Sequence, residues 1–297
     1  MVRALALAFV VGGTALSVTG CGAAGPGLAK QIPAADPGAA RDPINRLQVD
    51  ALRDISRRVL AELVAALPAE HQARVRDIPL LGDNSLGDVN AYASCSDDGT
   101  PFVAVSDGLL QISAHLAMSV ASDEVFDTDK RTDYLDWLEH HALEAPPVGF
   151  YYFAHHTDRT KIARQRELFE EEVAYILAHE LAHHYLGHLA CNSASGGLEE
   201  LGQLAADNVP VFSQAGELAA DVAATKNLLN AGAQRAGYAW TEEGALLVIA
   251  AFNHRRPLGV RDVLLGFERT HPIPHLRAPA ITTTAELWRG SGGYLPL

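Results

Sequence analysis

The chain has 297 residues, which is enough for one sizeable domain with its own core or for two small ones. Its composition is that of a globular protein, but 36 acidic residues against 23 lysines and arginines leave a formal net charge of −13. This acidic balance argues against a nucleic-acid partner and against electrostatic docking on anionic lipid.

The N-terminus has the features of an exported lipoprotein. Arg3 precedes an apolar run, Ala4 to Val18, that is too short to span a membrane comfortably. Val18-Thr-Gly-Cys21 then resembles the bacterial lipoprotein signal, in which small residues precede a cysteine that is lipidated and becomes the first residue. An ordinary secretory signal and a weak anchor helix are the alternatives, and they also place the rest of the chain outside the cytoplasm. We therefore expect a signal peptide over residues 1–20.

Residues 21–43 are rich in glycine, alanine and proline and lack hydrophobic periodicity. This composition predicts a flexible tether between the lipid anchor at Cys21 and a domain over residues 44–297.

Export changes the interpretation of the two remaining cysteines. Cys95 and Cys191 form an even pair in a compartment where disulfides persist. A Cys95–Cys191 disulfide and a pair of buried, inert thiols both fit this composition. Neither cysteine has the C-x-x-C spacing of a redox or zinc-thiolate site.

The first half of the domain carries elements that serve packing. Apolar residues at helical spacing predict a helix over residues 44–67, which Pro68 ends. Ser106-Asp-Gly108 separates the last predicted strand from a helix expected over residues 109–121. Short apolar runs between Gly, Asp and Ser predict the strands, at residues 80–82, 89–93 and 102–105.

Residues 122–160 have no clean period. They contain two histidine pairs, the Pro146-Pro147 pair and a run of aromatic residues from Phe150 to Phe153. We expect an insertion with one or two short helices, either as an irregular surface excursion or as a lid over a site.

The second half is predicted to be helical, with helices over residues 161–190, 213–231 and 242–254. Residues 260–267 also have helix-like spacing. The prolines within residues 270–275 predict a loop there.

The helix over residues 161–190 contains the pattern His179-Glu180-Leu-Ala-His183. Histidines four residues apart lie on one face of a helix, so both rings can reach one metal ion. Glu180 is offset around the helix, where it can contact a water on that metal without being a ligand. Surface histidines at a polar helix end are the alternative, so other residues must decide.

A catalytic zinc usually has three protein ligands and keeps a fourth position for water. A metzincin would have its third histidine at position 189 and a glycine at position 186, but both positions hold leucine. Glu217-Leu-Ala-Ala-Asp221 offers instead a glutamate ligand and, one turn on, an aspartate that can orient a ligating histidine. Two acids in a helix of small and apolar residues are poorly explained as a solvated face.

These motifs resemble those of the HtpX-like, CaaX-prenyl-protease-like family of gluzincin metallopeptidases, whose signature is H-E-x-x-H-x-x-x-x-H followed by E-x-x-A-D. His188 supplies the last histidine of the first motif. Residues elsewhere resemble the family's strand, its following helix and its Thr-His-Pro segment: Asn90–Ala93, Val103–Val105, Gly108–Leu110 and Thr270–Pro272 with Arg277. The resemblance covers roughly residues 89–277.

The resemblance implies a zincin-like α+β domain, mainly helical, with a small β-sheet and an active-site helix that carries the HExxH motif. It implies one Zn²⁺ per chain, held by His179, His183 and Glu217, with Asp221 behind a ligating histidine. Zinc would polarise the scissile carbonyl and lower the pKa of its water, and Glu180 would act as general base.

Four further roles are expected around this centre. His271 is the candidate oxyanion donor, or a fourth ligand that closes an idle site; a structural loop histidine is the alternative. His188 is expected to support helix packing and His184 to be exposed. The strand over residues 102–105 is expected to be an edge strand that pairs with extended substrate.

We therefore predict a zinc-dependent endopeptidase, lipid-anchored outside the cytoplasm, that cleaves envelope or misfolded extracytoplasmic proteins. Its expected partners are protein or peptide substrates and the membrane that holds the anchor, with no nucleic acid. A catalytically silent relative that acts as a chaperone or scaffold is the alternative, against which the intact Glu180 argues. A metal-storage lipoprotein is weaker still, because the other histidines are scattered.

Overall fold

The computed structural model describes residues 41–85, 89–141, 144–191, 212–254, 274–293 and 295. The predicted signal peptide and most of the tether, including Cys21, lie outside these ranges. So do the helix-like residues 260–267 and His271. Within the described ranges, no helix combines the length and the apolar character needed to cross a membrane.

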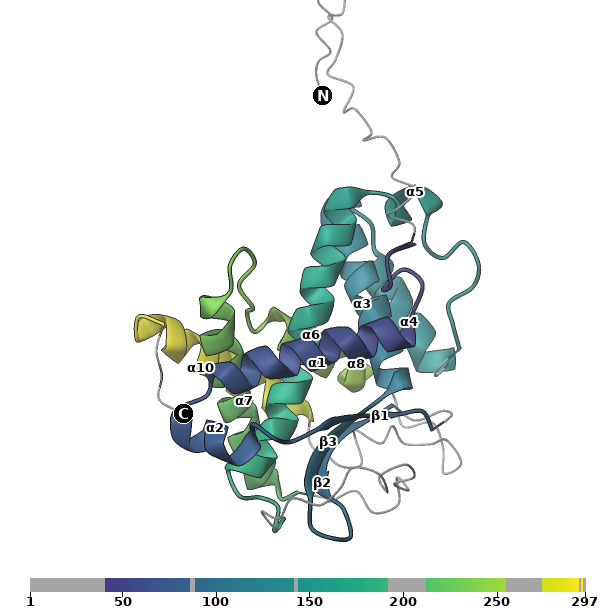
Figure 1. Cartoon of the computed structure of the whole chain (residues 1–297). Coiled ribbons are helices and arrows are strands. Elements are labelled where there is room, and N and C mark those ends of the chain that lie inside the picture. Colours follow the sequence, from purple (N-terminus) through teal and green to yellow (C-terminus); the bar gives the residue numbers. More distant parts are fainter. Residues whose placement is uncertain are drawn as a thin grey trace, which may run out of the picture. The chain divides into compact units, whose positions relative to one another are not determined.

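Helices dominate the described residues, with a small sheet near the start (Figure 1). In chain order the elements are α1 (Val49–Ala66), α2 (Ala69–Val75), β1 (Leu80–Asp83), β2 (Ala91–Cys95), β3 (Pro101–Ser106), α3 (Asp107–Phe126), α4 (Lys130–His141), α5 (Phe153–His156), α6 (Arg159–Tyr185), α7 (Gln214–Gln234), α8 (Glu243–His254) and α10 (Pro274–Gly290). The prediction of a mainly helical α+β fold with a small sheet is confirmed.

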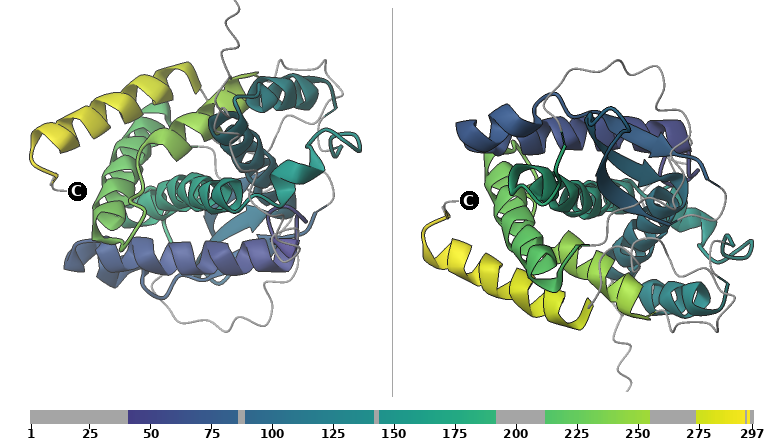
Figure 2. Two further views of the ribbon diagram at one scale, coloured as in Figure 1. Left: turned by 90° about the horizontal axis from the view of Figure 1, so that it is seen from above. Right: turned by 90° about the horizontal axis from the view of Figure 1, so that it is seen from below.

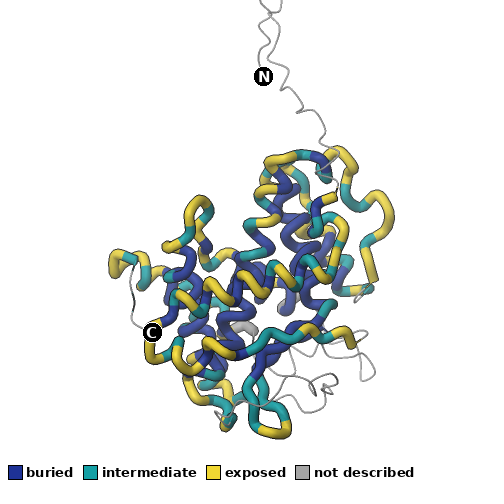
Figure 3. The backbone as a smooth tube through the Cα atoms, viewed as in Figure 1, coloured by how far each residue is buried: buried dark blue, intermediate teal, exposed yellow. Residues whose placement is uncertain are grey.

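Helix α6 is the element around which the others pack. It contacts α1, α3, α7 and α8, and both views of Figure 2 show it between α1 on one side and α10 on the other. A helix that is apolar on most sides needs neighbours on most sides, and α6 is buried from Leu168 to Tyr185 with few breaks. Figure 3 shows this buried path through the centre of the described chain.

Helix α6 ends earlier than predicted, at Tyr185 rather than near residue 190. Gly187 adopts a φ of +76°, a left-handed conformation that glycine takes without strain. Its N–H donates to the carbonyl of His184 at 3.1 Å, and the N–H of His188 donates to that of His183 at 2.9 Å. This is a Schellman turn, and it directs the chain after α6 back toward the last turn of the helix.

The sheet has the strand order β1-β3-β2. β3 pairs in parallel with β1 and antiparallel with β2, so β3 is the central strand. The expectation that residues 102–105 form an edge strand is wrong. The reason is burial: every residue of β3 after Pro101 is buried, and the most apolar strand of a sheet takes its centre.

The predicted insertion over residues 122–160 contains the end of α3 and two further helices, α4 and α5. α4 packs on α3 and α8, and α5 packs on α6. The Asp123 carboxylate caps α4 by accepting from the N–H groups of Lys130 and Arg131. α5 comes just before the start of α6. At a rise of 1.5 Å per residue, the start of α6 is about 30 Å from the HExxH motif on the same helix. The described part of the segment therefore forms no lid over the motif.

Two helices, α2 and α10, were not predicted. The loop expected over residues 270–275 is wrong from Pro274 onward, because Pro274 begins α10. A proline suits the first position of a helix, where its missing N–H would have no partner within the helix. Pro279 lies inside the same helix. α10 contacts α7 and α8, and this packing outweighs the cost of the interior proline.

Candidate metal centre

His179, His183 and Glu217 meet at the contact between α6 and α7. Each side chain is buried, and the three can offer ligand atoms within 4.8 Å of one another. The Nε2 atoms of His179 and His183 are 3.2 Å apart. The Glu217 carboxylate places Oε2 3.3 Å from Nε2 of His179 and Oε1 3.4 Å from Nε2 of His183.

These spacings fit a zinc ion. Ligands at about 2.0–2.1 Å from zinc in a tetrahedral arrangement lie about 3.4 Å from one another. The two ring nitrogens are close to that separation, and so is each ring nitrogen from the nearer oxygen of the carboxylate. Two imidazole nitrogens and one carboxylate oxygen are also the donor set of a catalytic zinc site with an open fourth position. The residues present therefore fit the metal that the sequence predicts.

Asp221 orients the first of these histidines. Its Oδ1 lies 2.9 Å from Nδ1 of His179, and it also accepts from the Tyr175 hydroxyl at 2.7 Å. Burial alone would raise the pKa of Asp221, but the Arg277 guanidinium and the His179 ring hold that pKa well below its usual range. An ionised Asp221 accepts a hydrogen bond from the Nδ1–H of His179, which leaves the Nε2 lone pair free to bind a metal.

Arg277, from α10, balances the buried charge of Asp221. Its Nε donates to Oδ2 at 2.8 Å and its Nη2 donates to Oδ1 at 2.6 Å, a two-point contact. Nη2 also lies 3.3 Å from Nδ1 of His179. Both atoms are donors when the Nδ1–H of His179 is hydrogen-bonded to Asp221, so this contact is not a hydrogen bond. The sequence pointed to Arg277 only through the family's Thr-His-Pro segment, and its role becomes visible with the fold of α10.

His188 contacts His183 in the way that Asp221 contacts His179. The sequence did not indicate this role. Its Nδ1 lies 2.9 Å from Nδ1 of His183. The Phe212 ring covers the His183 ring, with centroids 3.7 Å apart and planes within 14° of parallel. His183 is therefore held from its Nδ1 side and along one face. The Schellman turn after α6 brings His188 back into this position.

Glu180 is fully buried on α6, directly after the first ligand. Its position on the helix next to His179 is the one expected for a base beside a metal site. His184 differs from its prediction: it is half-buried, and its Nε2 lies 2.9 Å from the Phe102 carbonyl of β3. Burial lowers the pKa of His184, so its neutral ring donates to β3 and links α6 to the sheet.

A disulfide joins Cys95 and Cys191, whose Cα atoms are 5.5 Å apart. It connects the end of β2 to the chain just after α6. The sheet is thus attached to the HExxH end of α6 by a covalent bond as well as by His184.

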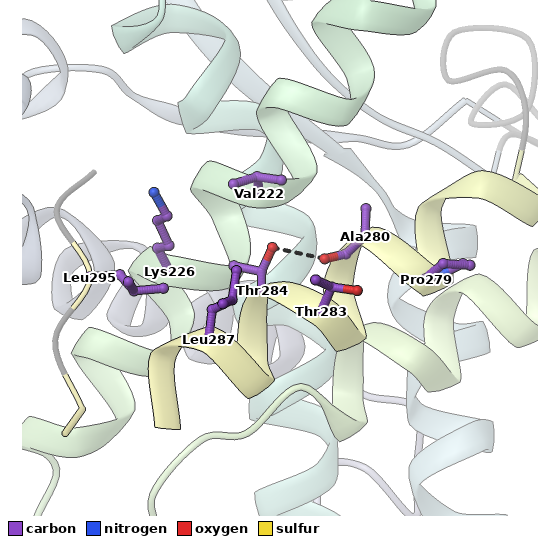
Figure 4. A pocket seen from close by; sticks show the side chains of 8 residues that line it. All are labelled: Val222, Lys226, Pro279, Ala280, Thr283, Thr284, Leu287 and Leu295. Atoms are coloured by element: carbon purple, nitrogen blue, oxygen red, sulfur yellow. Dashed lines mark hydrogen bonds between the residues drawn. The ribbon is translucent and has the colours of Figure 1, made fainter. Parts of the chain in front are cut away.

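A groove of about 490 Å³ lies elsewhere, between α7 and α10 (Figure 4). It is mostly apolar and is lined by Val222, Lys226, Pro279, Ala280, Thr283, Thr284, Leu287 and Leu295. None of these residues belongs to the metal centre, and the Thr284 hydroxyl donates to the Ala280 carbonyl at 2.8 Å. The groove is therefore separate from the metal centre.

The sequence model of peptidase family M48 matches residues 55–285, more than half of the chain. The chain belongs to peptidase family M48. The match runs from α1 into α10 and includes every residue of the metal centre described above. No curated protein and no solved structure matches the chain.

Membership of family M48 confirms the predicted resemblance to HtpX-like and CaaX-prenyl-protease-like peptidases. It gives the activity class, a metallopeptidase that hydrolyses peptide bonds. The buried His179, His183 and Glu217 are the candidate metal site of this M48 peptidase within the described residues.

Proposed function

We propose that this M48 peptidase is a zinc-dependent endopeptidase that cleaves extracytoplasmic proteins. The observation that carries the proposal is the meeting of three buried donor groups: the two ring nitrogens are 3.2 Å apart, and each lies 3.3–3.4 Å from an oxygen of the Glu217 carboxylate. Glu180 lies on the same helix as the two histidines. A chaperone or scaffold would need neither this donor set nor a base next to it, so the silent alternative is not favoured.

Each residue of the centre has a distinct task. Bound zinc would supply a Lewis acid for the scissile carbonyl and lower the pKa of the attacking water. His179, His183 and Glu217 would hold the ion, and Asp221 with Arg277 holds the ring of His179. Glu180 takes the proton of the attacking water and returns it to the leaving amine. His271 remains the candidate donor to the developing oxyanion.

Strand β2 is the candidate for holding an extended substrate. It pairs with β3 along one side, so its other side is an edge within the described sheet. It also contacts α6, whereas β1 lies on the far side of β3. An extended peptide that adds to β2 would have its backbone held by main-chain hydrogen bonds near the HExxH helix.

The lipoprotein signal supplies the proposed location. Acylation of Cys21 would attach the mature chain to a membrane, and the following residues to about position 43 would act as the tether. The disulfide between Cys95 and Cys191 supports an oxidising, extracytoplasmic compartment.

The test uses the purified full chain, assayed for bound zinc and for cleavage of casein. We expect about one zinc per chain, and Glu180→Gln should lower the rate by about 10²-fold or more while zinc is retained. Activity that survives this change would contradict the assigned mechanism. Glu217→Ala should lose zinc, whereas Glu286→Ala, at an exposed position on α10, should not.

A further inference from the structure

An exposed apolar loop precedes α5. Among the described residues six large hydrophobic side chains are exposed, and three of them, Val148, Tyr152 and Phe153, lie within this stretch. Their exposed fractions are 107%, 58% and 75%. We define residues 147–153 as the apolar loop. Scattered exposed hydrophobic residues are normal, but a cluster on one loop marks an interaction surface.

The fold holds this loop in place. The Tyr151 hydroxyl donates to the His115 carbonyl at 3.1 Å and lies 3.0 Å from the Ser119 hydroxyl, so this side chain is anchored on α3. The Phe150 ring packs edge-on against Tyr134 of α4. Gly149 makes the turn between these anchors and Val148, with a φ of +90°. Val148, Tyr152 and Phe153 are therefore presented outward from a fixed base.

The N-terminal chain joins the domain beside the same loop. The Asn45 side chain donates to the His156 carbonyl at 3.0 Å, and its Oδ1 lies 2.9 Å from Nδ1 of His156. The buried Asp42 carboxylate accepts from Gln165 at 2.8 Å and from Arg166 at 2.6 Å. Residues 42–45 are thus fixed next to α5, as Figure 1 shows for the start of the described chain.

The tether sets how far this end can lie from a lipid anchor. Cys21 and Arg41 bound the Gly/Pro-rich tether proposed above, and a random coil of that length has an r.m.s. end-to-end distance of about 25 Å. A lipid on Cys21 would therefore keep α5 and the apolar loop close to the membrane surface. A partner protein, a second copy of the chain or a bilayer could cover the loop. A lipid anchor on Cys21 would bring the loop close to a bilayer.

We propose that the apolar loop inserts into the interface of the lipid bilayer that holds the anchor. This inference rests on the lipid anchor of the proposed function. Tyrosine and other aromatic residues favour the boundary between headgroups and acyl chains. The chain carries a net charge of −13, so apolar burial rather than attraction to anionic lipid drives the contact.

Docking of the loop would set the height of the metal centre. α6 begins at Arg159, just after α5, and the ligand histidines lie about 30 Å further along it. The peptidase would then cut polypeptide segments held no more than about 30 Å above the base of α6, such as the extracytoplasmic parts of membrane-bound proteins. This gives the substrate class of the proposed function a geometric definition.

Tryptophan substitution in the full chain tests the proposal. Val148→Trp and Tyr152→Trp proteins are reconstituted in phosphatidylcholine vesicles that contain lipids brominated on their acyl chains. We expect the added emission to shift to the blue and to be quenched about twofold or more, after subtraction of the wild-type signal. Leu287→Trp is the matched control, since Leu287 is 60% exposed on α10, and its emission should be unaffected.

Two results would overturn the proposal. Emission from positions 148 and 152 that matches that of position 287 would leave the loop in water. A blue shift without quenching by brominated lipid would place the loop against protein, either a partner or a second copy. Fatty-acid labelling of the wild-type and Cys21→Ser chains measures the anchor separately. Casein cleavage in detergent by a Val148→Asp, Phe153→Asp chain, which we expect to be unchanged, measures the peptidase separately.

Discussion

The two histidines of the candidate metal site are oriented by chemically different groups. His179 faces the charged carboxylate of Asp221, whereas His183 faces the imidazole of His188. A neutral His188 can accept the Nδ1 proton of His183 only if its own proton is on Nε2. This contact fixes the His183 tautomer and leaves its Nε2 lone pair for the metal, the same task that Asp221 performs for His179.

If this role is correct, zinc affinity depends on the hydrogen-bond acceptor at position 188 rather than on the presence of an aromatic ring there. His188→Leu should weaken zinc binding by about 10–100-fold, because the Nδ1 proton of His183 loses its partner. His188→Asn, which keeps an acceptor oxygen, should retain most of the affinity. Competition with a chelator measures both. Equal zinc loss in the two variants would indicate that His188 only fills space.

Lys161 makes the stability of the protein depend on pH. Its ammonium group is fully buried between Gln165 and Asn45, and burial lowers the pKa of Lys161 from 10.5 to about 7. Between these two values the unfolded chain binds the proton and the folded chain does not. The free energy of unfolding should therefore rise with pH, by up to about 1.4 kcal/mol per unit from pH 7 upward.

Lys161→Met should remove this rise. Urea denaturation of both proteins at pH 7 and pH 9 measures the difference in slope. Lys226→Met, at a partly buried position in the groove between α7 and α10, is the control and should keep the wild-type slope. If the Lys161→Met protein shows the same pH dependence as the wild type, another group is responsible.

At the scale of elements, α6 and α8 approach so closely that one contact requires glycine. A Cβ atom on Gly244 of α8 would lie 2.6 Å from the backbone of both Glu171 and Glu172. Gly244→Ala should therefore lower the free energy of unfolding by about 1–3 kcal/mol. Gly290→Ala, where no atom lies within 4 Å of the added carbon, should change it by less than about 1 kcal/mol. Urea denaturation compares the two, and equal effects would contradict the close packing.

The arrangement of the strands decides where substrate can bind. β3 is paired with β1 along one edge and with β2 along the other, so its backbone N–H and C=O groups already form hydrogen bonds within the sheet. His184 further occupies the Phe102 carbonyl. Among the described strands, β2 is the one near α6 that has a side without a strand partner, and its Cys95 end is held by the disulfide.

At the scale of the whole molecule, the disulfide closes a long loop. Cys95 and Cys191 are separated by 96 residues, and closing a loop of that length in the unfolded chain is worth about 2–5 kcal/mol. The Cys95→Ala, Cys191→Ala protein should unfold at a correspondingly lower urea concentration, with zinc content unchanged. A thiol reagent should detect neither cysteine in the folded wild-type protein. Reaction at either residue would contradict the bond.

The candidate ligands were predictable because they depend on local geometry. His179 and His183, and likewise Glu217 and Asp221, are four residues apart, and a helix places such pairs on one face whatever surrounds it. The helices α7 and α8 were confirmed within a few residues for the same reason, since their apolar periodicity is a local property. Cys21 and His271 lie outside the described residues and remain predictions.

Only the tertiary structure decided which distant groups complete the centre. Arg277 meets Asp221 because α10 packs on α7 despite its interior proline, and His188 meets His183 because Gly187 turns the chain. These contacts depend on packing between elements, which no sequence period encodes. The sequence alone predicted a two-histidine, one-glutamate centre; the fold determined what holds those side chains in place.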